Sequence, residues 1–232
     1  RQRRLIRCTR HLAERVERSI TQGRLPLILG DCTAGVGAFA GLRRRRDDVA
    51  VVWVDAHCDL NTEASTLTGY LGGMPLAAIL GESLPWLTAA AGMNGRCDER
   101  RVALVGAREF DPYERSFLDR SRITRVTCRE LNDSGRAGVA AAAVAGPAEA
   151  VYLHIDVDAL DPAMMPSVTF PSPGGLTIDS LLALVDAVAS SGKVRALAVT
   201  SFNPHRGDAL ESAETLTRLI SRIASACCGS GV

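Results

Sequence analysis

The sequence is short of the features that mark several classes of protein. Only 4% of its 232 residues are aromatic, so stacking platforms for single-stranded nucleic acid are not expected. Neither sign of charge dominates, because 27 Lys and Arg face 26 Asp and Glu. The net charge of +1 therefore gives no electrostatic basis for binding nucleic acid or an anionic membrane. No run of about 18 apolar residues occurs, which argues against a membrane-spanning helix.

The cysteines do not form the pattern of a disulfide framework or of a zinc site. They number seven, only Cys227 and Cys228 are close together, and there is no CxxC pair. We therefore expect reduced thiols in a cytoplasmic protein, and no signal peptide is visible. The sequence opens Arg-Gln-Arg-Arg-Leu without a methionine, so we expect the native N-terminal start to be missing or shortened.

The remaining composition and patterning predict an α/β protein. With 47% hydrophobic and 23% charged residues, the chain is ordinary for a globular protein, and its length fits a single domain over residues 1–232. Continuous apolar runs that alternate with helical stretches predict a three-layer α/β/α fold with a mainly parallel sheet. The expected strands are 26–29, 49–55, 101–106, 123–128, 150–156 and 194–202, and the expected helices are 7–22, 138–145, 178–190 and 213–226.

Polar residues at the ends of two predicted strands form the candidate site. Ligands of open α/β sheets bind at the carboxyl ends of the strands. Asp55, His57 and Asp59 are spaced at every second residue, so strand geometry would point all three to the same side. Asp156 and Asp158 repeat this spacing after another strand. We expect the two groups to converge.

Four carboxylates and an imidazole at one point require a compensating positive charge. Like charges raise one another's pKa, and a divalent cation removes that conflict. Carboxylate oxygen and imidazole nitrogen suit Mn²⁺, Fe²⁺ or Zn²⁺, and two ions bridged by carboxylates would also fit. His154 lies two residues before Asp156 on the same predicted strand, and we expect it to support the ligands rather than to bind the metal.

Several segments resemble the ureohydrolases, the family of arginases, agmatinases and formimidoylglutamases. They occur in family order: Leu29-Gly-Asp-Cys32, Trp53-Val-Asp-Ala-His-Cys-Asp-Leu-Asn-Thr62, His154-Ile-Asp-Val-Asp-Ala-Leu-Asp-Pro162, Gly174-Gly-Leu-Thr177 and Phe202-Asn-Pro204. The first strand of that family and its loop have no visible counterpart. The resemblance implies an arginase-like fold, a small-molecule substrate and a homo-oligomer, since the family usually forms trimers or hexamers.

The resemblance also implies a metal centre. Two Mn²⁺ ions per chain would activate a hydroxide that attacks a guanidinium or amidine carbon. Asp55 and Asp156 would bridge the ions, and Asp59 would also accept a proton from the bridging water. The implied metal ligands are Cys32, Asp55, His57, Asp59, Asp156 and Asp158.

Four further positions match the substrate contacts of arginases. Asn61 and Thr68 stand where the substrate carboxylate is held. Asp111 and Glu114 resemble the two acids that receive the amino group of arginine, although a helix start after Pro112 would also explain them. The resemblance therefore implies a substrate that carries an amino group.

Three positions depart from the family pattern. Cys32 stands where a His ligand is usual, and its softer thiolate favours Zn²⁺ over Mn²⁺. Ser201, in the substrate site, replaces a Glu that clamps the guanidinium, and Gly72 replaces a His that shuttles protons. We therefore do not expect ordinary arginase activity. Cys32 together with the segment Tyr70-Leu-Gly-Gly-Met74 resembles the hydroxyarginine hydrolase branch, which does not account for Ser201.

Three functions remain open. The leading hypothesis is a metal-dependent hydrolase of linear C–N bonds in a guanidine, hydroxyguanidine or amidine derivative, in particular of an amino acid. A second is a mononuclear Zn²⁺ amide hydrolase, similar to deacetylases, in which Asp55 or Asp156 joins His57 and Asp158. A third is a catalytically weakened relative that binds a small molecule or assembles with active subunits.

Overall fold

The protein is built on a wholly parallel six-stranded sheet. The computed structural model describes residues 2–134, 141–142 and 144–229. The strand order is β1-β6-β5-β2-β3-β4, and every neighbouring pair is parallel. The α/β/α fold expected from the sequence is confirmed. The strands are β1 (Leu27–Gly30), β2 (Val49–Val54), β3 (Val102–Val105), β4 (Thr124–Val126), β5 (Ala150–Asp156) and β6 (Val194–Thr200).

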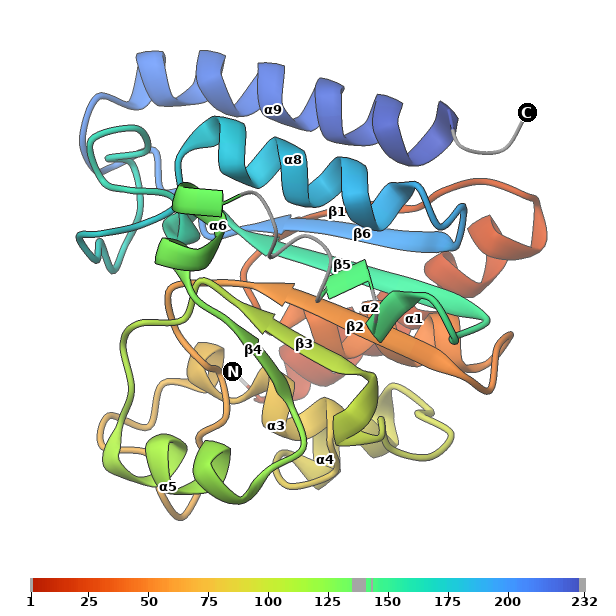
Figure 1. Ribbon diagram of the computed structural model, residues 1–232. Helices are drawn as coiled ribbons and strands as arrows, with labels where there is room; N and C mark the ends of the chain where they lie inside the picture. The colour runs from red at the N-terminus through yellow and green to blue at the C-terminus, as the bar shows by residue number, and fades with distance from the viewer. Residues whose placement is uncertain (1, 135–140, 143, 230–232) are drawn as a thin grey trace.

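Helices cover both faces of the sheet. Helices α8 and α9 lie on one face, and α1 to α4 lie on the other (Figure 1). The bounds are α1 (Gln2–Thr21), α2 (Ala34–Arg43), α3 (Pro75–Ile79), α4 (Pro85–Ala90), α5 (Pro112–Arg120), α6 (Cys128–Ser134), α8 (Ile178–Ala189) and α9 (Ala209–Gly229). Helix α1 begins five residues before its predicted start and α9 four residues before its own. Four residues of the helix predicted over 138–145 lie outside the described residues, and the other four, 141–142 and 144–145, are helical.

The central strands are apolar along their whole length because both of their faces are buried. All six side chains of β2 are buried. Alternate residues enter different cores: Val52 and Val54 pack in the core that contains Leu184 of α8, whereas Trp53 packs in the core that contains Phe39 of α2. The sequence shows no two-residue alternation here because neither face meets water.

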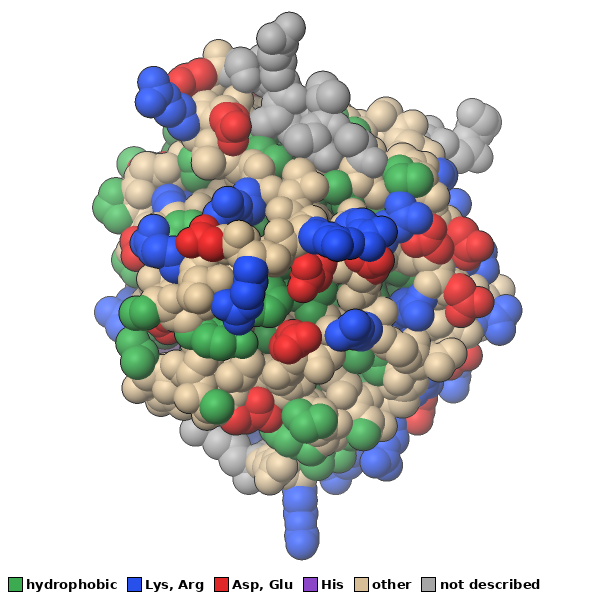
Figure 2. Space-filling view, turned by 60° about the horizontal axis from the view of Figure 1, so that its bottom comes forward, with side chains coloured by type: hydrophobic (Ala, Val, Ile, Leu, Met, Phe, Trp, Pro, Cys, Tyr) green, Lys and Arg blue, Asp and Glu red, His purple; other side chains and the backbone are tan. Residues whose placement is uncertain are grey.

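The outer surface agrees with the balanced composition. Figure 2 shows one face of the molecule, on which Lys and Arg side chains are interspersed with Asp and Glu. The arginine run at 43–46 is partly paired, since Arg44 contacts Glu17 at 3.1 Å and Arg43 donates to the carbonyl oxygen of Asn94. In the part of the chain that the structure describes, no helix has the length and apolar character needed to cross a membrane.

Arg108, just after β3, joins three loops at the carboxyl edge of the sheet. Its guanidinium donates to the backbone carbonyl oxygens of Asp158 at 2.9 Å and Ala159 at 3.2 Å, in the turn after β5. It also donates to the carbonyl oxygens of Ser172 at 2.7 Å and Pro173 at 3.2 Å, in the loop before α8. One cation therefore fixes the backbone that carries Asp158.

We expect Arg108→Gln to lower the free energy of unfolding by about 2–4 kcal/mol, because several buried carbonyl groups lose a charged donor. Arg129→Gln is the matched control, since the Arg129 side chain is 91% exposed and pairs with Asp133 on the helix surface. The control should cost about 0.5 kcal/mol or less. Chemical denaturation measures both values, and equal losses in the two variants would contradict this role for Arg108.

Candidate active site

The carboxyl edge of the sheet opens into a cavity of about 730 Å³. Parallel pairing aligns the strand ends, so that Val54 lies opposite Ile155 and Asp156 lies opposite Thr200. Every site residue predicted from the sequence except His154 lines this cavity. They are Cys32, Asp55, His57, Asp59, Asn61, Thr68, Asp111, Glu114, Asp156, Asp158 and Ser201.

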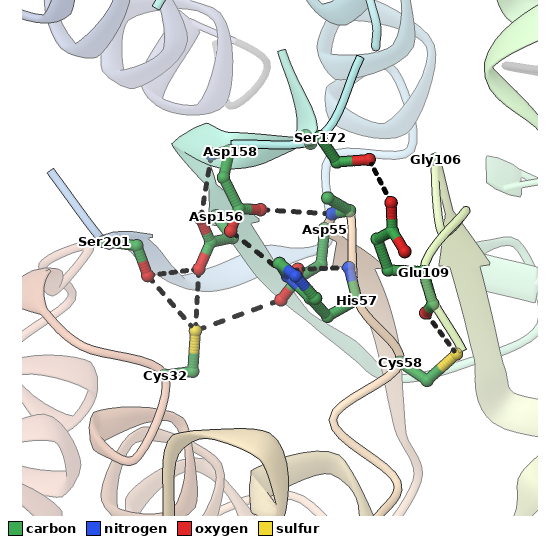
Figure 3. Close-up of polar contacts among 12 residues, drawn as sticks. Cys32, Asp55, His57, Cys58, Gly106, Glu109, Asp156, Asp158, Ser172 and Ser201 are labelled. Atoms are coloured by element: carbon green, nitrogen blue, oxygen red, sulfur yellow. Dashed lines mark hydrogen bonds and ion pairs between the residues drawn. The ribbon is translucent and has the colours of Figure 1, made fainter. Parts of the chain in front are cut away.

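His57 lies between two buried carboxylates (Figure 3). Its Nδ1 is 3.3 Å from Oδ1 of Asp55 and 3.2 Å from Oδ2 of Asp158. Partial burial lowers the pKa of His57, but the hydrogen bonds to Asp158 and Asp55 outweigh it and raise that pKa to about 11. Asp55 also accepts the backbone N–H of His57 at 2.7 Å, and Asp158 accepts that of Ala56 at 3.2 Å.

A single oxygen of Asp156 accepts three side-chain donors. Oδ2 accepts hydrogen bonds from the Cys32 thiol at 2.8 Å and from the Ser201 hydroxyl (Figure 3). It also accepts one from the Thr200 hydroxyl at 3.3 Å. The other oxygen, Oδ1, accepts the backbone N–H of Asp158 at 2.9 Å. Burial and the charge of Asp158 nevertheless raise the pKa of Asp156 to about 8. These donors therefore offset only part of the cost of burying the charge.

Asp59 differs from the other buried acids of the cavity because one of its oxygens has no hydrogen-bond partner in the described part of the chain. Oδ2 of Asp59 is buried and accepts no hydrogen bond from any described residue. Burial, followed by the charges of Asp55 and Asp156, raises its pKa well above the usual range. The backbone of Asp59 has a φ of 53°, in the left-handed region, so the chain does not continue past β2 as an extended strand. An orphaned buried carboxylate oxygen beside other acids fits a bound cation.

Two sets of ligand atoms are close enough to hold a metal ion. Asp55, His57 and Asp158 form one set, in which all three atoms lie within 4.8 Å of one another. Cys32, Asp55 and His154 form the second. Carboxylate, imidazole and thiolate are ligands of Mn²⁺, Fe²⁺ and Zn²⁺ in proteins, and the thiolate is the softest of them. The residues present therefore fit a divalent metal.

His154 lies behind the cavity and is fully buried. Its ring stacks on Trp53 with centroids 3.6 Å apart and an interplanar angle of 2°. Nδ1 is 2.9 Å from the hydroxyl of Tyr152, and Nε2 is 3.2 Å from that of Thr200. Burial lowers the pKa of His154 to about 3, so the ring is neutral. Both nitrogens are occupied, which agrees with a supporting position rather than with a free ligand.

The Glu114 side chain accepts hydrogen bonds from the backbone. Its two carboxylate oxygens accept the N–H groups of Leu60 at 3.0 Å and of Asp111 at 2.9 Å, and this caps α5. The Asp111 side chain accepts a hydrogen bond from the Asn61 amide at 2.8 Å. The helix-start explanation therefore applies to Glu114, although its side chain also lines the cavity.

Three aromatic residues of the cavity wall, Tyr70, Phe110 and Phe170, were not predicted from the sequence as site residues. The rings of Tyr70 and Phe170 meet edge to face, with centroids 5.5 Å apart. The Tyr70 ring covers Gly72, where an added Cβ would lie 2.4 Å from Tyr70 Cε1. A larger residue at position 72 would therefore displace Tyr70. The segment that carries Tyr70 was a visible signal, but the loop that carries Phe170 has no pattern that indicates a site.

Comparisons with known proteins agree with this geometry. The family model described as "Arginase family" matches residues 2–226. The chain is 35% identical over 213 residues to an arginase of Schizosaccharomyces pombe, covering 90% of this chain and 66% of the relative. It is 33% identical over 197 residues to the arginase of Bacillus caldovelox, covering 83% and 66%. The chain thus spans just under two thirds of the length of these two relatives.

The crystal structure of arginase from Bacillus cereus superposes with a TM-score of 0.90 at 28% identity, covering 97% of this chain and 78% of that one. Formimidoylglutamase from Bacillus subtilis superposes with a TM-score of 0.80, and its 18% identity supports the shared fold alone. The family match over nearly the whole chain, the fold and the cluster of acids at the ends of β2 and β5 lead to one conclusion: this chain is a divergent member of the arginase, or ureohydrolase, family.

Proposed function

We propose that this protein is a metal-dependent hydrolase of linear C–N bonds in a guanidine, hydroxyguanidine or amidine derivative of an amino acid. The observation that carries the proposal is the buried Oδ2 of Asp59, which has no partner among the described residues and lies in a cavity that four other buried acids also line. Such a group of acids is compatible with folding at neutral pH when cations offset its charge. Membership of the arginase family supports hydrolysis as the chemistry.

We assign the ligands of two Mn²⁺ ions to the residues predicted from the sequence. Asp55, His57, Asp156 and Asp158 would hold one ion, and Cys32, Asp55, Asp59 and Asp156 the other. Ions held there would supply an activated water and would offset the negative charge. Asp59 is the group we assign to accept a proton from that water, because its Oδ2 has no other described partner.

Two positions in the cavity lining, Ser201 and Gly72, favour a substrate less basic than arginine. The Ser201 hydroxyl binds Asp156 and carries no charge that could pair with a guanidinium. Tyr70 occupies the space above Gly72, where a proton-shuttling His would stand. A hydroxyguanidine or an amidine depends less on both groups. Asn61, Thr68 and Asp111 are the groups we assign to the amino-acid end of the substrate.

A mononuclear zinc amide hydrolase is the second candidate. Its support is the thiol of Cys32, which binds Asp156 at 2.8 Å and leaves the group of Asp55, His57 and Asp158 as the more conventional site for one ion. A cytoplasmic location and a homo-oligomer remain predictions from the sequence and the family.

Metal content separates the candidates. We expect protein purified without chelators to contain close to two Mn per chain by plasma mass spectrometry, and to hydrolyse one of three classes: guanidines, hydroxyguanidines or formimidoyl amino acids. Asp156→Asn is the inactive control, with an expected loss of at least about 100-fold in kcat/KM. One Zn per chain would favour the amide hydrolase instead. No metal after reconstitution with excess Mn²⁺ would exclude both enzymes.

We expect Cys32→His to raise the affinity for Mn²⁺, and hence the Mn²⁺ occupancy at limiting metal, together with turnover, because imidazole is a better ligand than a thiol for this harder ion. Cys97→Ala is the control, since Cys97 is buried but does not line the cavity. Titration of the metal-free variants with Mn²⁺, followed by assays at saturating metal, measures both quantities. If occupancy and turnover were unchanged in Cys32→His, Cys32 would not be the residue that limits this site.

The stability of the metal-free protein should fall as the pH rises. Burial raises the pKa of Asp55 to about 6 and that of Asp156 to about 8. Because both values exceed those of the unfolded chain, the folded state holds protons that the unfolded state releases, and stability is lost between about pH 4 and 8. The pKa of His57 is also higher in the folded protein than in the unfolded chain. Its contribution to stability is therefore lost as the pH rises above about 6.5.

We therefore expect the Tm in excess chelator to decrease from pH 5 to pH 8. Saturating Mn²⁺ should remove the decrease, because the cation binds the deprotonated ligands. Asp156→Asn in chelator should show a shallower slope than the parent protein. A Tm that rises with pH in the metal-free parent would contradict the raised pKa values of this group.

A further inference from the structure

Four buried side chains form a continuous line of hydrogen bonds behind the cavity. The Tyr152 hydroxyl lies 2.9 Å from Nδ1 of His154, and Nε2 of the same ring lies 3.2 Å from Oγ1 of Thr200. Oγ1 of Thr200 lies 3.3 Å from Oδ2 of Asp156. Tyr152, His154 and Thr200 are each at most 1% exposed. The line therefore runs from the interior to a residue of the cavity without contact with solvent.

Counting donors decides the direction of these hydrogen bonds. If Tyr152 donates to Nδ1, then Nε2 carries the ring proton and donates to Thr200, which donates in turn to Asp156. In this arrangement every hydrogen has an acceptor. In the reverse arrangement the Tyr152 hydroxyl has no acceptor among the described residues. With Asp156 ionised, as in a metal-binding carboxylate, Thr200 would then donate to His154, and its oxygen would face the carboxylate of Asp156 without a hydrogen between them.

The surroundings of the His154 ring restrict it to one orientation. The stacked indole of Trp53 covers one face of the ring at a centroid distance of 3.6 Å. The indole N–H of Trp53 itself donates to Oδ2 of Asp55 at 3.2 Å. Trp53 therefore contacts one of the acids directly and supports the ring that acts on another.

We propose that His154 is a positioning residue, held as the Nε2–H tautomer by Tyr152, that orients the Thr200 hydroxyl toward Asp156. Thr200 lies opposite Asp156 in the register of β5 and β6, so the sheet brings the two side chains together. The His154 ring decides only that the Thr200 hydroxyl donates its hydrogen to Asp156. The Thr200 hydroxyl is one of three donors on Oδ2, beside Cys32 and Ser201. The effect of this line is to fix the rotamer and the acceptor oxygen of Asp156.

The part of this proposal that concerns metal affinity rests on the proposed function, in which Asp156 is a ligand. The part that concerns the tautomer of His154 does not rest on the proposed function, so it is tested first and without metal. The chain has only four histidines, which makes ¹⁵N-detected spectra of the imidazole rings simple to assign. Single substitutions of His11, His57 and His205 by Gln identify their signals and leave His154 in place.

At a pH above the raised pKa of Asp156, we expect the His154 ring of the metal-free protein to show a directly bonded proton on Nε2 and a downfield, unprotonated Nδ1. Tyr152→Phe removes the donor to Nδ1 while it conserves the ring, and it should introduce a measurable population of the Nδ1–H tautomer. A dominant Nδ1–H tautomer in the parent protein, or no change in Tyr152→Phe, would overturn the proposed direction.

The second test compares Thr200→Val with Thr200→Ser by metal titration calorimetry. Valine conserves the shape and removes the hydroxyl, whereas serine keeps it. We expect Thr200→Val to weaken Mn²⁺ binding about tenfold or more and Thr200→Ser to weaken it about threefold or less. Equal affinities in the two variants would overturn the positioning role, whereas a parent protein that binds no metal would overturn the proposed function and leave the tautomer result standing. Thermal melts of both variants confirm that each is folded.

Discussion

The structure depends on the burial of four carboxylates at the ends of two adjacent parallel strands. Asp55, Asp59, Asp156 and Asp158 are all at most 4% exposed, where ionised groups repel one another strongly. Each of three acids is offset by its own donors, from backbone N–H groups, the Trp53 indole, the imidazole of His57 or nearby hydroxyl and thiol groups. Asp59 has an oxygen without such a donor among the described residues. This oxygen is the basis of the proton-accepting role that we propose for Asp59, and we expect the buried acids to limit the pH range in which the metal-free fold is stable.

The departures from the family pattern are structurally connected. Cys32 and Ser201 come from different elements and yet donate to the same oxygen of Asp156. Gly72 leaves room for the ring of Tyr70, which in turn packs against Phe170. Ser201 and Gly72 therefore stand in contact with neighbouring residues of the cavity, and neither offers a charged side chain to a substrate. This absence of charge is the reason why we propose a substrate of lower basicity than arginine.

Much of the architecture could be predicted from local patterns. β2 and β5 are continuous apolar runs because both sheet faces are covered, and acids at their ends mark the edge where ligands bind. Less could be predicted where contacts between segments distant in sequence determine the structure. Helix α1 begins at Gln2 rather than at the predicted Arg7. It packs against α2, and this tertiary interaction is not visible in the local apolar pattern. Phe170 has no periodic signal because the cavity wall it forms exists only after the chain has folded.

The sequence by itself determined the fold class, the family and the identity of the acids, because apolar periodicity and motif spacing are local properties. Only the tertiary structure decided how each acid is used. It showed that Glu114 caps a helix, that Asp59 has an oxygen with no partner among the described residues, and that Cys32, Thr200 and Ser201 share one acceptor. Thr200 and Cys32 are 168 residues apart in sequence. They lie near Asp156 because of the order and register of the parallel strands. No local sequence pattern encodes that order and register.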